Sequence, residues 1–193
     1  MKRVSNRGQQ YNILGMTIIE LLVVMTIISI SIGLAAPPLN ELLIKNRVSA
    51  QISILGRVIT VARTSAIYLN QVVTLCRSDN QKKCQGKWQD GLILFTDTNK
   101  DRINNNNDRI LVTINPFPKG DRIFWRAFQN KQYLQMTPRG YTRYQNGTFT
   151  YCPKEGLQYA RGIILNATGR LRYTSDSDGD GINEGADGKP LRC

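Results

Sequence analysis

The sequence predicts an α+β protein, in which a long N-terminal α-helix packs on one or more antiparallel β-sheets. Two patterns support this fold class. Residues up to about 70 show the apolar periodicity of helices, whereas residues 71–193 contain short runs typical of strands, separated by turn residues. At 193 residues the chain is long enough for one globular domain and an extended element.

The first helical segment, residues 16–36, is almost entirely apolar and is long enough to cross a bilayer, which requires about 20 residues. A short leader, residues 1–15, precedes it and carries Lys2, Arg3 and Arg7. Basic residues beside a membrane span favour the cytoplasmic side, so we expect a cytoplasmic leader and an external C-terminus. An ordinary signal peptide is the alternative, but its cleavage site would follow the apolar run rather than precede it.

The second helical segment, residues 37–70, begins at Pro37-Pro38. We expect a kink or local melting there, because proline removes a backbone donor and clashes with the preceding turn. Basic residues of this segment, among them Arg63, fall mainly on the faces away from its apolar residues. We therefore expect an amphipathic helix packed on the domain formed by residues 71–193. Its apolar residues recur at steps of four and three: Ile44, Val48, Ile52, Leu55, Ile59, Ala62, Ala66 and Leu69.

A carboxylate, Glu20, lies inside the first apolar segment. A charged side chain at membrane depth costs on the order of a few kcal/mol, so Glu20 needs a partner. Cleavage between Gly15 and Met16 would create an α-amine that can pair with Glu20 of a neighbouring subunit. Residues 15–21, with the sequence GMTIIEL, resemble the type IV prepilin motif, with Met16 where Phe is usual. The resemblance implies cleavage and N-methylation of Met16 by a prepilin peptidase, followed by transfer from the inner membrane into a pilus at the cell surface.

Eight runs after Asn70 predict strands, because apolar, β-branched and aromatic residues dominate them. Asn146-Gly147 separates two of these runs and predicts a type I′ hairpin turn between them. The predicted strands are residues 72–76, 91–96, 109–115, 122–128, 141–145, 148–152, 160–166 and 170–174.

Residues 88–99, with the sequence WQDGLILFTDTN, are similar to a Trp-x-x-Gly-Trp-Ile-Val-Phe-x-Asp-x-Asn stretch of the GspH/FimT group of minor pilins and pseudopilins. Leu92 replaces the second Trp, and Arg102 stands where Gly is common. The resemblance implies a type IV pilin-like fold, closest to the FimT members, with other pilins as partners. It implies a subunit of a type IV pilus or of a type II secretion pseudopilus.

Two arginines, Arg170 and Arg172, follow a turn that ends at Gly169. Because strand side chains alternate between faces, both guanidiniums project from one face, about 7 Å apart, and can clamp phosphate groups. A solvated strand edge is the alternative, since arginine on an edge strand also discourages aggregation. Residues 169–172 are similar to the Gly-Arg-x-Arg motif of FimT-like minor pilins. This similarity implies sequence-independent binding of DNA, in support of DNA uptake in natural transformation.

The distribution of charge agrees with an anionic partner. The chain has a formal charge of +12, from 26 Lys and Arg against 14 Asp and Glu, although its tail, residues 176–193, is acidic. A basic surface attracts DNA without sequence preference. Tyrosines in the same region can stack on single-stranded bases, but strand aromatics are more often core residues. Four basic residues are weaker candidates for supporting DNA contacts: Lys154, Arg161, Arg139 and Arg143.

The acidic tail contains a candidate Ca²⁺ loop. Residues 176–187 fit the spacing D-x-D-x-D-G-x₅-D, in which oxygen ligands alternate and a glycine takes the sixth place. Residues 97–108 repeat the spacing less well, because Arg102 stands at the glycine position. An acidic turn without an ion is the alternative in both places, and no other cofactor is expected. The candidate ligands in the tail are Asp176, Asp178, Asp180 and Asp187.

Four cysteines, an even number in an exported chain, predict two disulfides. Three connectivities are open, and we favour local pairing because short loops close most readily. This pairing joins Cys76 to Cys84 and Cys152 to Cys193.

The composition argues against an enzyme. The chain has no histidine, which excludes a Ser-His-Asp triad, a Cys-His pair and a histidine zinc site. Its sequence also has no glycine-rich loop of the kind that cradles phosphates. A binding or structural subunit is therefore expected.

Overall fold

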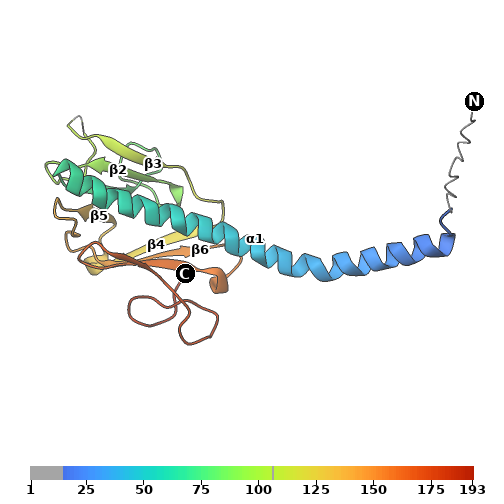
Figure 1. The fold of residues 1–193 in the computed structure, drawn as a ribbon. Coiled ribbons are helices and arrows are strands. Elements are labelled where there is room, and N and C mark those ends of the chain that lie inside the picture. The colour runs from blue at the N-terminus through green and yellow to red at the C-terminus, as the bar shows by residue number, and fades with distance from the viewer. Residues whose placement is uncertain (1–14, 106) are drawn as a thin grey trace, which may run out of the picture. The chain divides into compact units, whose positions relative to one another are not determined.

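The computed structural model describes residues 15–105 and 107–193, without the side chains of residues 34–38. In the described residues a long helix, α1 (Ile18–Leu69), precedes two four-stranded antiparallel sheets (Figure 1). The predicted α+β class is confirmed. The predicted leader lies outside the described residues, except for Gly15. Three short 3-10 helices connect the strands: η1 (Trp88–Asp90), η2 (Phe128–Asn130) and η3 (Leu157–Tyr159).

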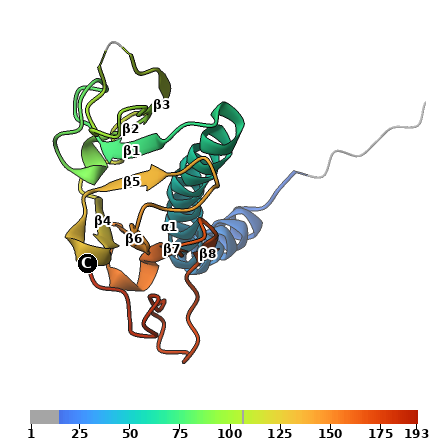
Figure 2. The same cartoon turned by 90° about the vertical axis from the view of Figure 1, so that its left-hand side faces the viewer.

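The first sheet has the strand order β3-β2-β1-β5, and the second has the order β4-β6-β7-β8. Neighbouring strands are antiparallel throughout. Figure 2 shows the strands in these two groups. The bounds are β1 (Val73–Arg77), β2 (Leu92–Thr96), β3 (Ile110–Ile114), β4 (Arg122–Ala127), β5 (Tyr133–Met136), β6 (Gly147–Cys152), β7 (Arg161–Leu165) and β8 (Leu171–Tyr173).

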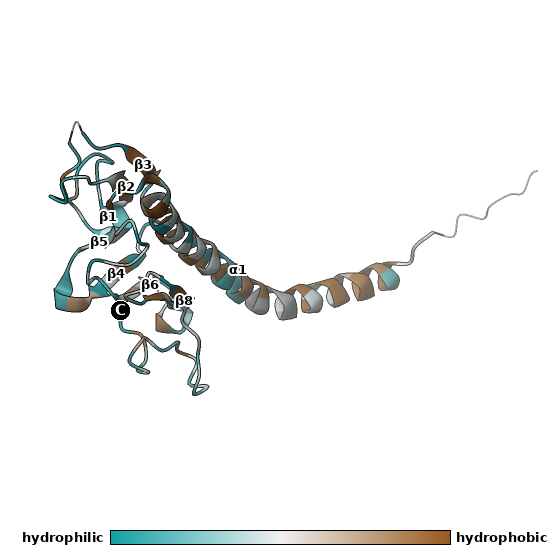
Figure 3. Ribbon diagram, turned by 60° about the vertical axis from the view of Figure 1, so that its left-hand side comes forward, coloured by the Kyte–Doolittle hydropathy of each residue, from teal (hydrophilic) through white to brown (hydrophobic). Residues whose placement is uncertain are grey.

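The chain divides into two compact units, one ending at Leu42 and the other formed by Leu43–Cys193. In the first unit, the side chains of Ile18–Gly33 are exposed along the whole segment, and Figure 3 shows their apolar character. The backbone stays helical through Pro37-Pro38, so the local melting expected there does not occur.

Two parts of α1 are candidates for a membrane span. Among the described residues, Leu39–Leu69 is long and apolar enough to cross a membrane, and Ile18–Gly33 is a shorter apolar stretch. Leu39–Leu69 is partly buried, because its apolar side chains belong to the core of the second unit. The apolar side chains of Ile18–Gly33 have no such role in the fold.

The core of the second unit lies between α1 and both sheets. In the second sheet Trp125 stacks on Phe149, with ring centroids 3.9 Å apart, and Leu75 and Leu94 of the first sheet belong to the same cluster. The amphipathic pattern of α1 is confirmed, and Val58, which was not in the predicted set, is buried on the same face. The buried residues that the spacing predicted are Val48, Ile52, Leu55, Ile59, Ala62 and Ala66.

A buried carboxylate, Asp121, ties α1 to β6. Asp121 accepts hydrogen bonds from the guanidinium of Arg47 at 2.5 Å, from the hydroxyl of Tyr151, and from the backbone N–H of Lys154 at 3.0 Å. Arg47 also pairs with Glu155 at 2.5 Å. Burial, and then the hydrogen bond that it donates to Asp121, raise the pKa of Tyr151 above its ordinary value. These contacts hold the helix in register with the second sheet.

The structure differs from the sequence prediction between β4 and β6. Residues 141–145 form a loop rather than a strand, so Asn146-Gly147 does not close a hairpin. Tyr144 has a φ of 64°, which interrupts an extended backbone, and the buried Gln145 side chain accepts a hydrogen bond from the backbone N–H of Gln135 at 3.1 Å. The unpredicted strand β5 completes the first sheet instead. Its four residues include no β-branched side chain, which is why its strand signal is weak.

Candidate functional site

The two candidate arginines follow a tight turn, residues 166–169, between β7 and β8. The side chain of Asn166 organises the turn by accepting a hydrogen bond from the backbone N–H of Arg170 at 2.9 Å. Gly169 has a φ of 73°, in the left-handed region that glycine adopts at little cost. A Cβ atom there would lie 2.1 Å from the carbonyl oxygen of Gly140, so the site also requires a close backbone approach.

Arg170 and Arg172 flank Leu171 at the beginning of β8, and both are exposed. Among the described strands, β8 pairs only with β7, where Arg172 lies opposite Ile164, so β8 is an edge strand. Leu171 is partly buried against the core. Because side chains alternate along a strand, the two arginines face away from that core, and about 7 Å separates them. This spacing allows each guanidinium to contact its own phosphate group.

The turn packs against the loop of residues 137–146, which precedes β6. The backbone N–H of Thr142 donates a hydrogen bond to the carbonyl of Ala167 at 3.0 Å. Gly169 of the same turn lies against the carbonyl oxygen of Gly140 in this loop. Small-ligand sites typically measure about 300–1,000 Å³, and the open groove between this turn and loop measures ≈ 730 Å³.

Four side chains give this groove a basic and aromatic lining. Arg139 and Arg143 line it, and both were weaker candidates from the sequence. Tyr141 and Tyr144 also line it, with 50% and 77% of their surfaces exposed. These two tyrosines therefore lie outside the core, where their rings are free to stack on unpaired bases.

One cation at this site, Arg63, was missed by the sequence reasoning. Its Nε donates a hydrogen bond to the carbonyl of Gly140 at 3.1 Å. The same Nε would lie 3.2 Å from a Cβ atom at Gly169, so the guanidinium borders the turn. The helical pattern assigned Arg63 to a solvent-facing side of α1, and no signal in the sequence indicated its contact with Gly140.

The other two candidates, Lys154 and Arg161, lie away from this groove. Arg161 stands opposite Tyr151 at the start of β7, and its Nη1 donates to the carbonyl of Ala160 at 2.8 Å. The turn follows Leu165 at the other end of β7, about 13 Å along the strand. Lys154 is exposed beside Gly120. Neither residue is brought together with Arg170.

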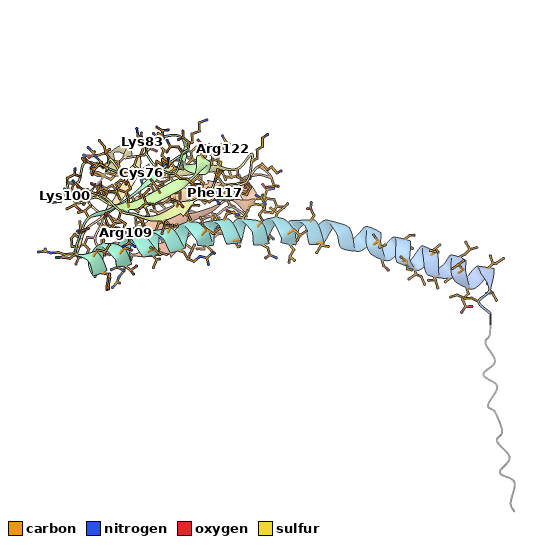
Figure 4. The ribbon with its side chains drawn as sticks, turned by 90° about the horizontal axis from the view of Figure 1, so that it is seen from above. Cys76, Lys83, Lys100, Arg109, Phe117 and Arg122 are labelled. Atoms are coloured by element: carbon orange, nitrogen blue, oxygen red, sulfur yellow. A yellow bond between two sulfur atoms is a disulfide. The ribbon has the colours of Figure 1, made fainter. Side chains whose placement is uncertain are left out.

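Basic residues also occur elsewhere on the domain. Figure 4 labels four exposed ones that come from loops and strands of both sheets, Lys83, Lys100, Arg109 and Arg122. The positive charge of the chain is therefore spread over its surface. The groove combines Arg139 and Arg143 with the exposed Tyr141 and Tyr144.

The candidate processing residues lie at the start of α1. Gly15 and Met16 precede the helix, and the backbone N–H of Glu20 in its first turn donates to the hydroxyl of Thr17 at 3.3 Å. Met16 and Glu20 are exposed. The Gly15–Met16 bond thus lies in exposed, non-helical backbone near a terminus, and proteolysis concentrates in such segments.

Both predicted disulfides are present, Cys76–Cys84 and Cys152–Cys193. The first closes a loop after β1, and the second joins the last residue to the end of β6. The candidate Ca²⁺ ligands Asp176, Asp178 and Asp180 lie together in the tail, with Glu184 as the fourth member of the group in place of Asp187.

A long helix with an exposed apolar segment, followed by antiparallel sheets that pack on its C-terminal part, defines a protein of the type IV pilin class. Two crystal structures of the type IV minor pilin FimU from Pseudomonas aeruginosa share this fold, with TM-scores of 0.53 and 0.51. Their sequence identities are 16% and 15%, and the matches cover 66% of this chain and 87% and 92% of the FimU chains. At these identities the likeness establishes the fold.

The sequence establishes the family. The family model of the type II transport protein GspH matches residues 55–169, which is more than half of the chain. The chain belongs to the GspH family, and it is a minor pilin or pseudopilin of a type IV pilus or a type II secretion system. Proteins of this family are pilin-like structural proteins rather than enzymes. No curated protein matches this sequence. The predicted GspH/FimT membership is confirmed, and the closer relation to FimT stays a prediction.

Proposed function

We propose that this chain is a minor pilin that binds extracellular DNA without sequence preference and thereby supports DNA uptake in natural transformation. The observation that carries the proposal is the contact between the turn of residues 166–169 and the loop of residues 137–146. This contact places the turn that precedes Arg170 and Arg172 beside the groove lined by Arg139 and Arg143. Arg63 borders the same turn. The groove, the turn and these arginines are hereafter called the arginine groove.

The chemistry of the arginine groove suits a phosphate backbone. Guanidinium groups form paired, charge-assisted hydrogen bonds with phosphate oxygens. The groove offers no helix for insertion into a major groove and no side-chain pattern for reading base edges, so we expect backbone contacts that carry no sequence information. Tyr141 and Tyr144 are placed to stack on unpaired bases, which favours single-stranded or frayed DNA as a ligand.

The N-terminal segment would deliver the arginine groove to the cell surface. We place the membrane span at residues 16–36, because the apolar side chains of Leu39–Leu69 already serve the core. A prepilin peptidase would cut between Gly15 and Met16 and methylate the new amine. Glu20 would then pair with that amine on a neighbouring pilin as the subunit leaves the inner membrane.

The test compares two double variants of the full chain in detergent micelles, each of which removes two positive charges. Arg170→Gln with Arg172→Gln alters the arginine groove, whereas Arg109→Gln with Arg122→Gln alters exposed arginines elsewhere. Fluorescence anisotropy measures binding to labelled DNA of mixed sequence. We expect the first pair to weaken binding about tenfold or more, and the second to change it by about twofold at most. Equal losses for the two pairs would show that overall charge, rather than this groove, holds the DNA.

A structural subunit without DNA binding is the second candidate function. The exposed apolar side chains of Ile18–Gly33 favour it, because assembly with other pilins requires such a segment whether or not DNA binds. Under this alternative the unaltered chain would retain no DNA at low salt. Retention that weakens steeply as salt increases supports the DNA-binding function instead.

A further inference from the structure

We infer that the acidic tail holds one Ca²⁺ ion, ligated by Asp176, Asp178, Asp180 and Glu184. Carboxylate oxygens of these four residues lie within 4.8 Å of one another. Ca²⁺ binds oxygen ligands at about 2.3–2.6 Å, so ligands on opposite sides of the ion are about 5 Å apart. The observed spacing therefore matches the size of a coordination shell around a single ion.

The buried carboxylate of Glu184 provides independent support for the site. Glu184 is only 7% exposed, and its Oε1 has no hydrogen-bond partner among the described residues. Its Oε2 accepts hydrogen bonds from the backbone N–H and the hydroxyl of Ser177, both at 2.7 Å. Burying an oxygen without a partner is unfavourable, and ionised aspartates nearby cannot donate a hydrogen bond to it. A cation among the four carboxylates provides the missing partner and offsets their mutual repulsion.

The loop presents its aspartates in fixed orientations. The two carboxylate oxygens of Asp176 accept hydrogen bonds from the backbone N–H groups of Gly179 at 2.7 Å and Gly181 at 2.9 Å. Both glycines have positive φ, at 81° and 87°, so the backbone curls around the Asp176 side chain. Such contacts orient a first ligand before the ion arrives.

The remainder of the tail holds Glu184 in its buried position. The backbone N–H of Leu191 donates to the carbonyl of Asn183 at 2.8 Å, and the side chain of Leu191 is buried. Two residues later the Cys152–Cys193 bond attaches the chain end to β6. The residues after Glu184 thus fold back onto the domain and hold this fourth ligand in place.

The ligand set differs from the twelve-residue spacing in one position. Asp187, the twelfth residue of that spacing, lies outside the group, and its Oδ1 accepts a hydrogen bond from the backbone N–H of Lys189 at 3.3 Å. Glu184, the ninth residue, takes its place. In the similar loop of residues 97–108, the described carboxylates form no such group. The carboxylates of Asp101 and Asp108 accept hydrogen bonds from donors of their own loop.

The expected ion is Ca²⁺ rather than Mg²⁺. Four carboxylates on an irregular loop suit Ca²⁺, which accepts irregular coordination by oxygen ligands, whereas Mg²⁺ requires a nearly ideal octahedron and keeps most of its water. For an extracytoplasmic loop we expect a dissociation constant of about 10⁻⁴–10⁻³ M. The loop follows the region that the GspH family model matches, which ends at residue 169.

The test uses the full chain in detergent micelles after treatment with a chelator, titrated with CaCl₂ or MgCl₂ in a calorimeter. We expect one Ca²⁺ per chain, with Mg²⁺ binding about tenfold more weakly or not at all. Glu184→Gln keeps the shape of the buried side chain. Asp178→Asn alters an exposed ligand and keeps an oxygen that can accept the hydrogen bond from the backbone N–H of Asp180. Each is expected to weaken Ca²⁺ binding about tenfold or more, whereas the control Asp187→Asn changes it by about twofold at most.

Three results would overturn the inference. The first is the absence of Ca²⁺ binding by the unaltered chain at concentrations of about 10 mM, well above the expected dissociation constant. The second is normal Ca²⁺ affinity in both ligand variants. The third is a loss of affinity in Asp187→Asn that equals the loss in Glu184→Gln, which would assign the fourth ligand to position 187.

Thermal unfolding provides a second readout of Ca²⁺ binding. We expect Ca²⁺ to stabilise the unaltered chain against thermal unfolding and to have no such effect on Asp178→Asn.

Discussion

Replacing Asp121 with alanine is expected to destabilise the C-terminal unit by about 3–5 kcal/mol. Removing one partner of a buried ion pair costs about that amount, because the other partner stays without compensation. The side chain of Arg47 is 29% exposed and keeps its contact with Glu155. We therefore expect the loss of the Arg47–Asp121 pair to cost about 3 kcal/mol, the lower end of this range. The buried hydroxyl of Tyr151 and the backbone N–H of Lys154 lose their acceptor as well, at about 1–3 kcal/mol for a buried donor without a partner.

Urea unfolding of the full chain in micelles measures this change. Trp88 and Trp125 are both buried in the C-terminal unit, so their fluorescence reports its unfolding. For a slope of about 1–3 kcal/mol/M, a loss of 3 kcal/mol lowers the midpoint by about 1–3 M urea. The matched control is Glu155→Gln, which removes the more exposed carboxylate of the same arginine and should cost about 1 kcal/mol at most. A cost below about 1 kcal/mol for the alanine variant, or equal costs for both variants, would refute the reasoning.

Two further predictions concern the arginine groove and the response to alkaline pH. Gly169→Ala forces a left-handed backbone on alanine and a clash with the carbonyl of Gly140, so it should lower the free energy of unfolding by about 1–2 kcal/mol and weaken DNA binding. Thermal unfolding checks this beside the control Thr168→Ser, which keeps the hydroxyl that donates to Asn166 at 2.8 Å; equal stability of the two variants contradicts the turn geometry. The raised pKa of Tyr151 means that the fold favours the neutral phenol, so its stabilising effect is complete below the ordinary value of about 10 and decreases as pH rises above it. Urea titrations should show an extra loss of up to about 1.4 kcal/mol per pH unit above 10 relative to Tyr151→Phe, and parallel curves for the two proteins would exclude this role for Tyr151.

Features with a local or periodic cause could be predicted from the sequence. The buried face of α1 follows from the spacing of Val48, Ile52 and Leu55, because helix geometry alone brings these residues to one side. The pairing of Cys76 with Cys84 follows from the short loop between them. Gly169 was predicted to end a turn, and the turn is present with the required left-handed backbone.

Features that depend on distant contacts could not be predicted. Arg63 contacts the carbonyl of a residue 77 positions later, and nothing in the helical pattern identifies that partner. Arg161 and Arg170 are close in sequence, yet the extended strand β7 lies between them. Glu184 was not a candidate ligand from the sequence spacing, whereas Asp187 was. Only the fold of the tail, in which Leu191 and Cys193 return to the domain, buries the first and leaves the second outside.

The bond between Cys152 and Cys193 has a consequence for proteolysis. It closes a covalent ring from two cysteines that are 41 positions apart in sequence, and this ring contains Arg170, Arg172 and the acidic loop. A protease that cuts one exposed bond within the ring opens it without releasing any fragment. The arginines and the acidic carboxylates would stay attached to the membrane-anchored chain until a second cut or a reductant separated them.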